Sequence, residues 1–185
     1  MGRSTAPEPV TEVIELASAW LPARMAEVER HLEARIGGWG PELESDAGET
    51  LAAGGKRMRP LLVLLCAGPA AGRGAIRAAA AIELVHMATL VHDDVLDAAP
   101  LRRGVPTIYA QAGAGRATAL GDLLFSRAFA ELGSDGDGAR RQVALLADAS
   151  VALARGELAQ RRDAYDVRVT AERYLYRCSL KTARL

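Results

Sequence analysis

Apolar residues recur at helical spacing along almost the whole chain. Between residues 11 and 36 they fall three or four positions apart, which predicts a helix that Thr11 caps and Pro22 kinks or splits. The same spacing predicts further helices over residues 41–53, 75–99, 118–132, 139–162 and 170–185. Alternating, strand-like patterns are almost absent, so the chain is expected to be all-α, with a flexible N-terminal arm at residues 1–10 and one domain over residues 11–185.

Charged residues interrupt the most apolar of these helices between Ile82 and Thr107. At about 100° per residue, Asp93 and Asp97 lie one turn apart on one face, and His86 lies two turns earlier within about 20° of them. The apolar flanks predict that this face is buried, where two carboxylates repel each other and need a cation. Because Mg²⁺ is usually held by one or two carboxylates together with substrate phosphates, we expect it at Asp93 and Asp97, with Asp94 between them. A solvated helix end is the competing interpretation.

A basic segment with two glycines lies at Gly54–Arg59, ahead of an apolar run. The glycines allow the backbone to approach an anion closely, and a helical turn would point Lys56 and Arg59 the same way. Two more cations, Arg102 and Arg103, follow the acidic motif. The segment is either a phosphate site or a solvated start of a helix, and the residues alone leave both interpretations open.

Composition narrows the class of protein. The chain has 185 residues, half of them hydrophobic and a quarter charged, with a formal net charge of zero, which is typical of a soluble domain and gives no indication of a nucleic-acid partner. The longest aliphatic run, residues 61–66, is too short to cross a bilayer, and the N-terminus has no apolar signal segment. Cys66 and Cys178 are expected to be reduced core residues of a cytoplasmic protein.

Six motifs in order carry a resemblance to a known family: GGKRMRP, ELVHMATLVHDDVLD, LRRGVPT, GDLLFSRA, GELAQ and YLYRCSLKTA. Each is weak alone, but together they resemble the trans-isoprenyl diphosphate synthases, or polyprenyl synthetases, from about residue 11 to residue 185. The resemblance implies a helical bundle of the isoprenoid synthase type around a central cavity. It also implies a prenyltransferase of isoprenoid biosynthesis, which joins isopentenyl diphosphate head-to-tail to an allylic prenyl diphosphate.

The same resemblance implies roles for individual residues. Mg²⁺ on Asp93 and Asp97 would hold the allylic diphosphate. The residues that match the family's catalytic positions are Asp93, Asp94, Asp97, Arg102 and Lys181. The matching substrate contacts are Lys56, Arg59, His86 and Arg103 for isopentenyl diphosphate, and Arg102, Lys181 and Thr182 for the allylic diphosphate.

Two small residues precede the acidic motif. In this family, bulky aromatic residues four and five positions before the first aspartate stop chain growth early. Here those positions hold Thr89 and Ala88, so the resemblance implies long-chain all-trans products. The alternative is that Ala88 and Thr89 are small only to let helices pack closely.

The family's second aspartate-rich motif, which follows the Lys-Thr pair, is not present in this sequence. We therefore expect the N-terminal part of a synthase, incomplete at the C-terminus and poorly active alone. The alternative is a non-catalytic or split-enzyme subunit that partners a complete synthase. A terpene cyclase is disfavoured, because a cyclase does not bind isopentenyl diphosphate and would not need GGKRMRP. Helices that are apolar over much of their circumference favour a homodimer or heterodimer.

Overall fold

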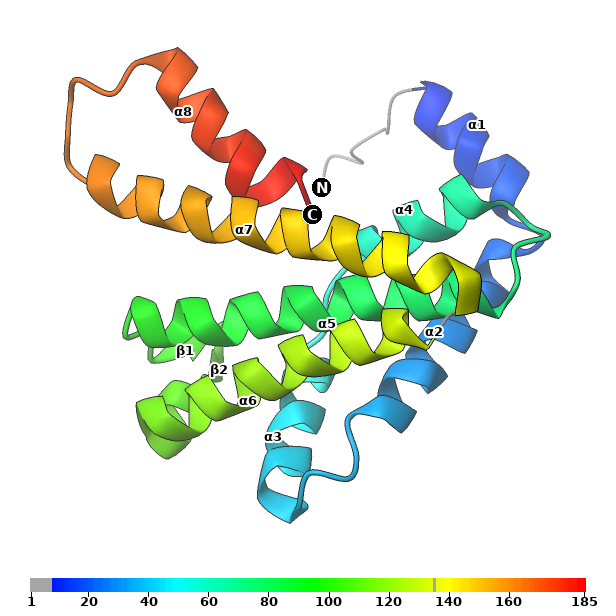
Figure 1. Ribbon diagram of the computed structural model, residues 1–185, viewed down its shortest axis with the longest axis horizontal. Coiled ribbons are helices and arrows are strands. Elements are labelled where there is room, and N and C mark those ends of the chain that lie inside the picture. The colour runs from blue at the N-terminus through cyan, green and yellow to red at the C-terminus, as the bar shows by residue number, and fades with distance from the viewer. Residues whose placement is uncertain (1–7, 135) are drawn as a thin grey trace, which may run out of the picture. The chain divides into compact units, whose positions relative to one another are not determined.

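The computed structural model describes residues 8–134 and 136–185 (Figure 1). Most of the expected arm at residues 1–10 lies outside the described residues, but residues 8–10 are helical. Thr11 is therefore inside the first helix and does not cap it. The chain divides into two compact units, Met1–Glu131 and Leu132–Leu185, and each is described by itself.

Helices build the first unit, as the sequence predicts. They are α1 (Glu8–Ala17), α2 (Leu21–Arg35), α3 (Pro41–Ala52), α4 (Met58–Ala67), α5 (Arg73–Leu96) and α6 (Ile108–Gly133), the last of which continues into the second unit. The only strands in the described residues are the two-residue pair β1 (Leu101–Arg102) and β2 (Val105–Pro106), which form an antiparallel hairpin. The expected split at Pro22 is confirmed, because α1 and α2 separate just before it and the proline lies in the first turn of α2.

Helix α5 is the core of the first unit and packs against α2 and α4 (Figure 1). Its fully buried side chains, Leu84 and Val85 among them, meet Val28 and Leu32 of α2 and Leu64 of α4 in the same core. Among the described helices, only α5 is long and apolar enough by length and composition to span a membrane. Its burial against two other helices gives that apolarity a packing explanation.

Thr107 joins the two ends of the connection between α5 and α6 through hydrogen bonds. Its hydroxyl donates to the carbonyl of Ala99 at 2.6 Å and accepts from the backbone N–H of Ala110 at 3.0 Å. Helix α6 therefore begins ten residues earlier than the apolar pattern predicts. The added residues 108–117 are helical except for a kink at Gly113, whose φ of 82° a residue with a side chain rarely adopts.

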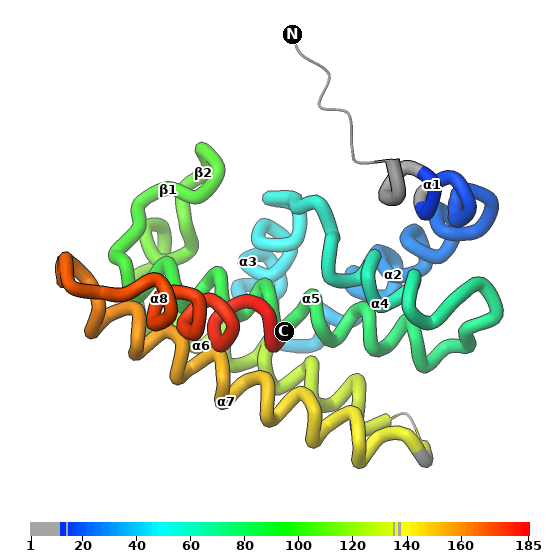
Figure 2. The backbone as a smooth tube through the Cα atoms, turned by 90° about the horizontal axis from the view of Figure 1, so that it is seen from above, coloured from blue at the N-terminus to red at the C-terminus, as the bar shows by residue number. Residues whose placement is uncertain are grey.

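The second unit contains a short 3₁₀ turn (Gly136–Gly138), α7 (Ala139–Asp163), α8 (Ala171–Cys178) and a π-helical turn (Ser179–Ala183), which Figure 2 shows following α8. The predicted last helix thus changes geometry at Ser179. Buried Asp163 accepts hydrogen bonds from Arg173 and Arg177 and so ties α8 to α7. Both cysteines are free, but the expectation of buried cysteines is wrong, because Cys66 is exposed and Cys178 half-buried.

Candidate functional site

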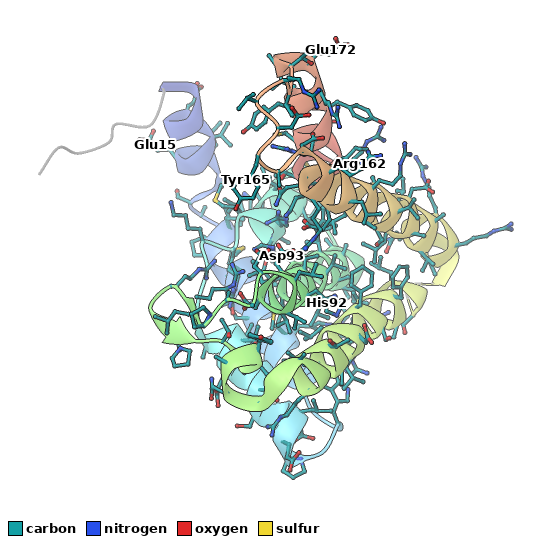
Figure 3. The ribbon with its side chains drawn as sticks, turned by 90° about the vertical axis from the view of Figure 1, so that its left-hand side faces the viewer. Glu15, His92, Asp93, Arg162, Tyr165 and Glu172 are labelled. Carbon is teal, nitrogen blue, oxygen red and sulfur yellow. The ribbon has the colours of Figure 1, made fainter. Side chains whose placement is uncertain are left out.

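One stripe of α5 is more open than the rest of the helix. Helical spacing places His86, Asp93 and Asp97 on it, and they are half-buried or exposed. The expectation that this acidic face is buried is therefore wrong, since the apolar residues that fill the core lie on the other side of α5. Asp97 is exposed because it caps the helix where α5 leaves the core. Figure 3, which looks along α5, shows Asp93 projecting from a different side of the helix than His92.

The middle aspartate of the motif, Asp94, forms a structural ion pair. Asp94 is buried. Its Oδ1 accepts a hydrogen bond from Nε of Arg102 at 2.8 Å and forms an ion pair with Nη2 of the same residue at 2.8 Å. This ion pair fastens the β1–β2 hairpin to the end of α5. Asp94 therefore points to the arginine, and Asp93 and Asp97 are the aspartates of the motif on the open stripe.

One residue of the basic segment, Arg57, also forms structural ion pairs. Arg57 adopts a left-handed conformation (φ 46°) ahead of α4 and forms ion pairs with Glu29 at 2.7 Å and Glu83 at 3.0 Å. Burial raises the pKa of the Glu83 carboxyl, and Arg57 beside it opposes the shift. Sequence reasoning missed this pair. The available signal was Glu83 itself, a carboxylate in an apolar helix that needs a buried partner.

The predicted contacts of isopentenyl diphosphate come together in one open cavity of about 450 Å³. Its lining includes Lys56, Arg59, His86 and Arg103. Gly55 lies on the same wall, where an added Cβ would be 3.2 Å from Nη1 of Arg57 and 3.4 Å from Nη1 of Arg103. A glycine therefore lets two guanidinium groups converge over the backbone, an arrangement that favours an anion in the cavity.

His86 is neutral in this cavity at pH 7. Burial, together with the positive charges of Arg59, Arg103, Arg102 and Arg57, lowers the pKa of its imidazole from 6.5 to about 4. The electrostatic potential that keeps a proton off His86 also attracts phosphate oxygens. A neutral imidazole can donate one hydrogen bond to such an oxygen.

Two residues of the GDLLFSRA motif have a packing role that sequence reasoning missed. An added Cβ on Gly121 would lie 2.2 Å from Nε2 of His92, so the imidazole ring occupies the space that a side chain at position 121 would need. His92 Nε2 lies 3.4 Å from Oδ1 of Asp122, whose side chain is largely exposed.

The predicted chain-length residues differ in position. Ala88 lies about 140° around α5 from Asp93 and is fully buried in the core. Thr89 lies about 40° from Asp93, is half-buried, and donates from its hydroxyl to the carbonyl of His86 at 2.8 Å. Only Thr89 belongs to the open stripe.

Lys181 and Thr182 lie in the second unit, within the π-helical turn. The ammonium group of Lys181 donates to Oε2 of Glu157 on α7. Lys181 is therefore held by a contact inside its own unit.

The carboxylates on the open stripe are too few to hold a metal ion by themselves, but they suit Mg²⁺, which also takes ligands from water and substrate. Across residues 8–134 and 136–185, no group of three His, Cys, Asp or Glu residues could hold a metal ion. Two carboxylates one turn apart, with Asp94 engaged by Arg102, match an ion that completes its shell with water and substrate phosphates.

A model of the polyprenyl synthetase family matches residues 41–185. The chain belongs to the polyprenyl synthetase family. This polyprenyl synthetase chain is 42% identical over 170 residues to heptaprenyl diphosphate synthase component 2 of Geobacillus stearothermophilus, a match that covers 90% of the chain and 52% of the relative. It is 37% identical to the octaprenyl diphosphate synthase of Escherichia coli, over 71% of the chain and 41% of the relative. The chain thus spans about half the length of the relatives it matches.

Solved polyprenyl synthetase structures have the same all-α isoprenoid synthase fold. A decaprenyl diphosphate synthase from Rhodobacter capsulatus matches with a TM-score of 0.85 and 35% identity, over 93% of this chain and 53% of the other. A polyprenyl synthase from Caulobacter crescentus, solved with calcium and isoprenyl diphosphate, matches with a TM-score of 0.81 and 33% identity, over 99% of this chain and 54% of the other. The expected fold class and family are confirmed.

Proposed function

We propose that this polyprenyl synthetase chain supplies diphosphate sites for a prenyltransferase that condenses isopentenyl diphosphate with an allylic prenyl diphosphate. The observation that carries the proposal is the single cavity lined by Lys56, Arg59, His86 and Arg103. Relatives named heptaprenyl and octaprenyl diphosphate synthases support long-chain products. The calcium and isoprenyl diphosphate in the Caulobacter structure support a divalent metal beside a diphosphate.

The roles follow from the charges. Lys56, Arg59 and Arg103 bind the diphosphate of isopentenyl diphosphate, and neutral His86 donates a hydrogen bond to it. Asp93 and Asp97 hold Mg²⁺, which stabilises the negative charge that develops on the departing diphosphate.

Three further residues act on the allylic diphosphate. Asp94 engages Nε and Nη2 of Arg102, which aims the rest of that guanidinium group toward the allylic diphosphate. Lys181 and Thr182 add donors on the same substrate.

Calorimetry with the two substrates separately tests these assignments. Lys56→Ala/Arg59→Ala should weaken binding of isopentenyl diphosphate by more than about tenfold and leave Mg²⁺-dependent binding of geranyl diphosphate in place. Asp93→Ala/Asp97→Ala should do the reverse. Glu33→Ala, which removes an exposed carboxylate on α2, is the control and should change neither. Equal loss of both ligands in both double variants would reject the two-site assignment.

A subunit role is the second candidate. It is supported by the relative named component 2 of a heptaprenyl diphosphate synthase. Under this proposal the chain alone turns over poorly and acts in the cytoplasm as a homodimer or heterodimer. Light scattering at micromolar concentration, followed by a condensation assay on the same fraction, decides it. A monomer with robust condensation would contradict both statements.

A further inference from the structure

The π-helical turn of the second unit is locked to α7 by two adjacent residues. Glu157 uses both carboxylate oxygens: Oε2 accepts a hydrogen bond from the Lys181 ammonium group, and Oε1 forms an ion pair with Nε of Arg161 at 3.2 Å. Its side chain is only 14% exposed, and that of Lys181 is 25% exposed. Arg161, on the same helix as Glu157, thus fixes the Glu157 carboxylate, and the carboxylate in turn fixes the Lys181 ammonium group.

Gly156 makes this contact possible. An added Cβ there would lie 2.6 Å from the backbone nitrogen of Lys181 and 2.8 Å from its Cα. These are backbone atoms, so the turn would have to move away to accept any side chain. Position 156 therefore sets the approach of the Lys181 backbone, and position 157 sets the direction of the Lys181 side chain. Local π-helical geometry, as in this turn, is frequent at functional sites.

We propose that Glu157 is a positioning residue that fixes the Lys181 ammonium group for an anionic ligand. The inference rests on the proposed function, in which Lys181 meets the allylic diphosphate. A lysine side chain has four flexible bonds, and holding its end in place beforehand reduces the entropy lost when a phosphate binds. Because Arg161 keeps the Glu157 carboxylate in place, the ammonium group can bind a phosphate oxygen without losing its orientation.

The sequence offers a direct probe, since Lys56 and Lys181 are its only lysines. Isotope labelling of lysine gives two side-chain signals in NMR, and exposed Lys56 serves as the internal reference. In the unaltered chain, Lys181 should show two distinct shifts for its Cε protons and restricted motion. Glu157→Gln should merge those shifts and make Lys181 as mobile as Lys56. Glu172→Gln, an exposed carboxylate in the first turn of α8, is the matched control and should leave both signals unchanged.

Binding of geranyl diphosphate with Mg²⁺ tests the consequence for the ligand. Glu157→Gln should weaken it about fivefold, and Glu172→Gln should not. Gly156→Ala should displace the Lys181 signals with no change of charge, whereas Gly133→Ala, where an added Cβ meets nothing within 4 Å, should not. Loss of folding in Gly156→Ala would leave the decision to Glu157→Gln.

The possible outcomes separate the two proposals. Unchanged Lys181 signals in Glu157→Gln overturn the positioning role whatever the binding result. If Lys181 becomes mobile in Glu157→Gln but the affinity for geranyl diphosphate is unchanged, the fixed position of Lys181 does not contribute to ligand binding, and that part of the proposal is overturned. If geranyl diphosphate fails to bind the unaltered chain, or binds Asp93→Ala/Asp97→Ala equally well, the proposed function fails, and the NMR comparison still decides whether Glu157 fixes Lys181.

Discussion

The basic cavity around His86 and the acidic end of α5 solve the same electrostatic problem in different ways. In the cavity, Arg57 pairs with Glu29 and buried Glu83, and the remaining cations face an open space. At the acidic end, Asp94 is paired with Arg102 of the hairpin. In both regions one charged residue of the motif builds the fold and its neighbours are directed outward.

The two regions differ in how far their charged groups are arranged before a ligand binds. The basic cavity keeps its cations converged around a glycine and holds His86 neutral, so it is arranged for an anion before one arrives. The acidic stripe has two carboxylates at different depths, with Asp97 exposed. It gains a defined geometry when a divalent cation joins Asp93 and Asp97, so metal and diphosphate are expected to bind there together.

The largest effect on stability is expected from Arg57→Ala. The change leaves Glu83 buried without its cation, which should lower the free energy of unfolding by about 3 kcal/mol. Arg59→Ala, two residues away in the same motif, removes a cavity cation that acts on Glu83 more weakly than Arg57 does, and it should cost far less. Urea unfolding of both variants checks the difference. Equal destabilisation would contradict the division between a fold arginine and a ligand arginine.

A smaller effect is expected at the acidic end. Asp94→Asn weakens the ion pair with half-exposed Arg102 and should cost about 1–2 kcal/mol. Asp97→Asn should leave stability unchanged or raise it slightly, because a carboxylate at a helix C-terminus opposes the helix dipole. The same Asp97→Asn should abolish Mg²⁺-dependent binding of geranyl diphosphate. Thermal unfolding and calorimetry on the two variants would reveal the reverse pattern if Asp94 were the ligand.

Much of this contrast could be predicted from the sequence, but the depth of each residue could not. Helical periodicity predicts α3 and α7 to within a residue at each end, because caps and glycines mark them. Spacing alone also aligns His86 with Asp93 and Asp97. It could not show that Asp97 is exposed, because burial depends on which neighbouring helices cover each face.

The residues that the sequence left unassigned are those whose partners are distant in the chain. Arg57 meets Glu83 across 26 positions, and Glu157 meets Lys181 across 24. Gly121 is explained only by His92 on another helix. Local pattern cannot specify such pairs, since helical spacing reports neighbours three or four positions apart. The π-helical turn at Ser179–Ala183 likewise depends on close packing against Gly156.

Acid titration should sharpen the contrast through His86. Burial and four arginines lower the pKa of His86 to about 4 in the folded chain, against 6.5 normally, so the unfolded chain binds the proton more strongly. The stability contribution of neutral His86 is therefore complete above pH 6.5 and is lost as the pH falls toward 4. His86→Gln should remove this part of the acid sensitivity. Urea midpoints between pH 7 and pH 4 for both proteins test it, and parallel curves would contradict the lowered pKa.

The smallest effect on stability, together with a clear effect on product length, is expected at Thr89, between the basic cavity and the acidic end of α5. Thr89 lies on the open stripe between His86 and Asp93, so a growing prenyl chain that leaves Asp93 along this stripe passes it. Thr89→Phe should place a ring there and shorten the products of a preparation active in condensation, at little cost to folding because the site is half-buried. Ala88→Phe, at the other position that the family resemblance links to chain length, inserts a ring into a fully buried position and should cost about 1–3 kcal/mol by overpacking. Chromatography of the products by chain length, with urea unfolding of both variants, separates the two effects. Unchanged products in Thr89→Phe, or short products already made by the unaltered protein, would show that the chain does not follow this stripe.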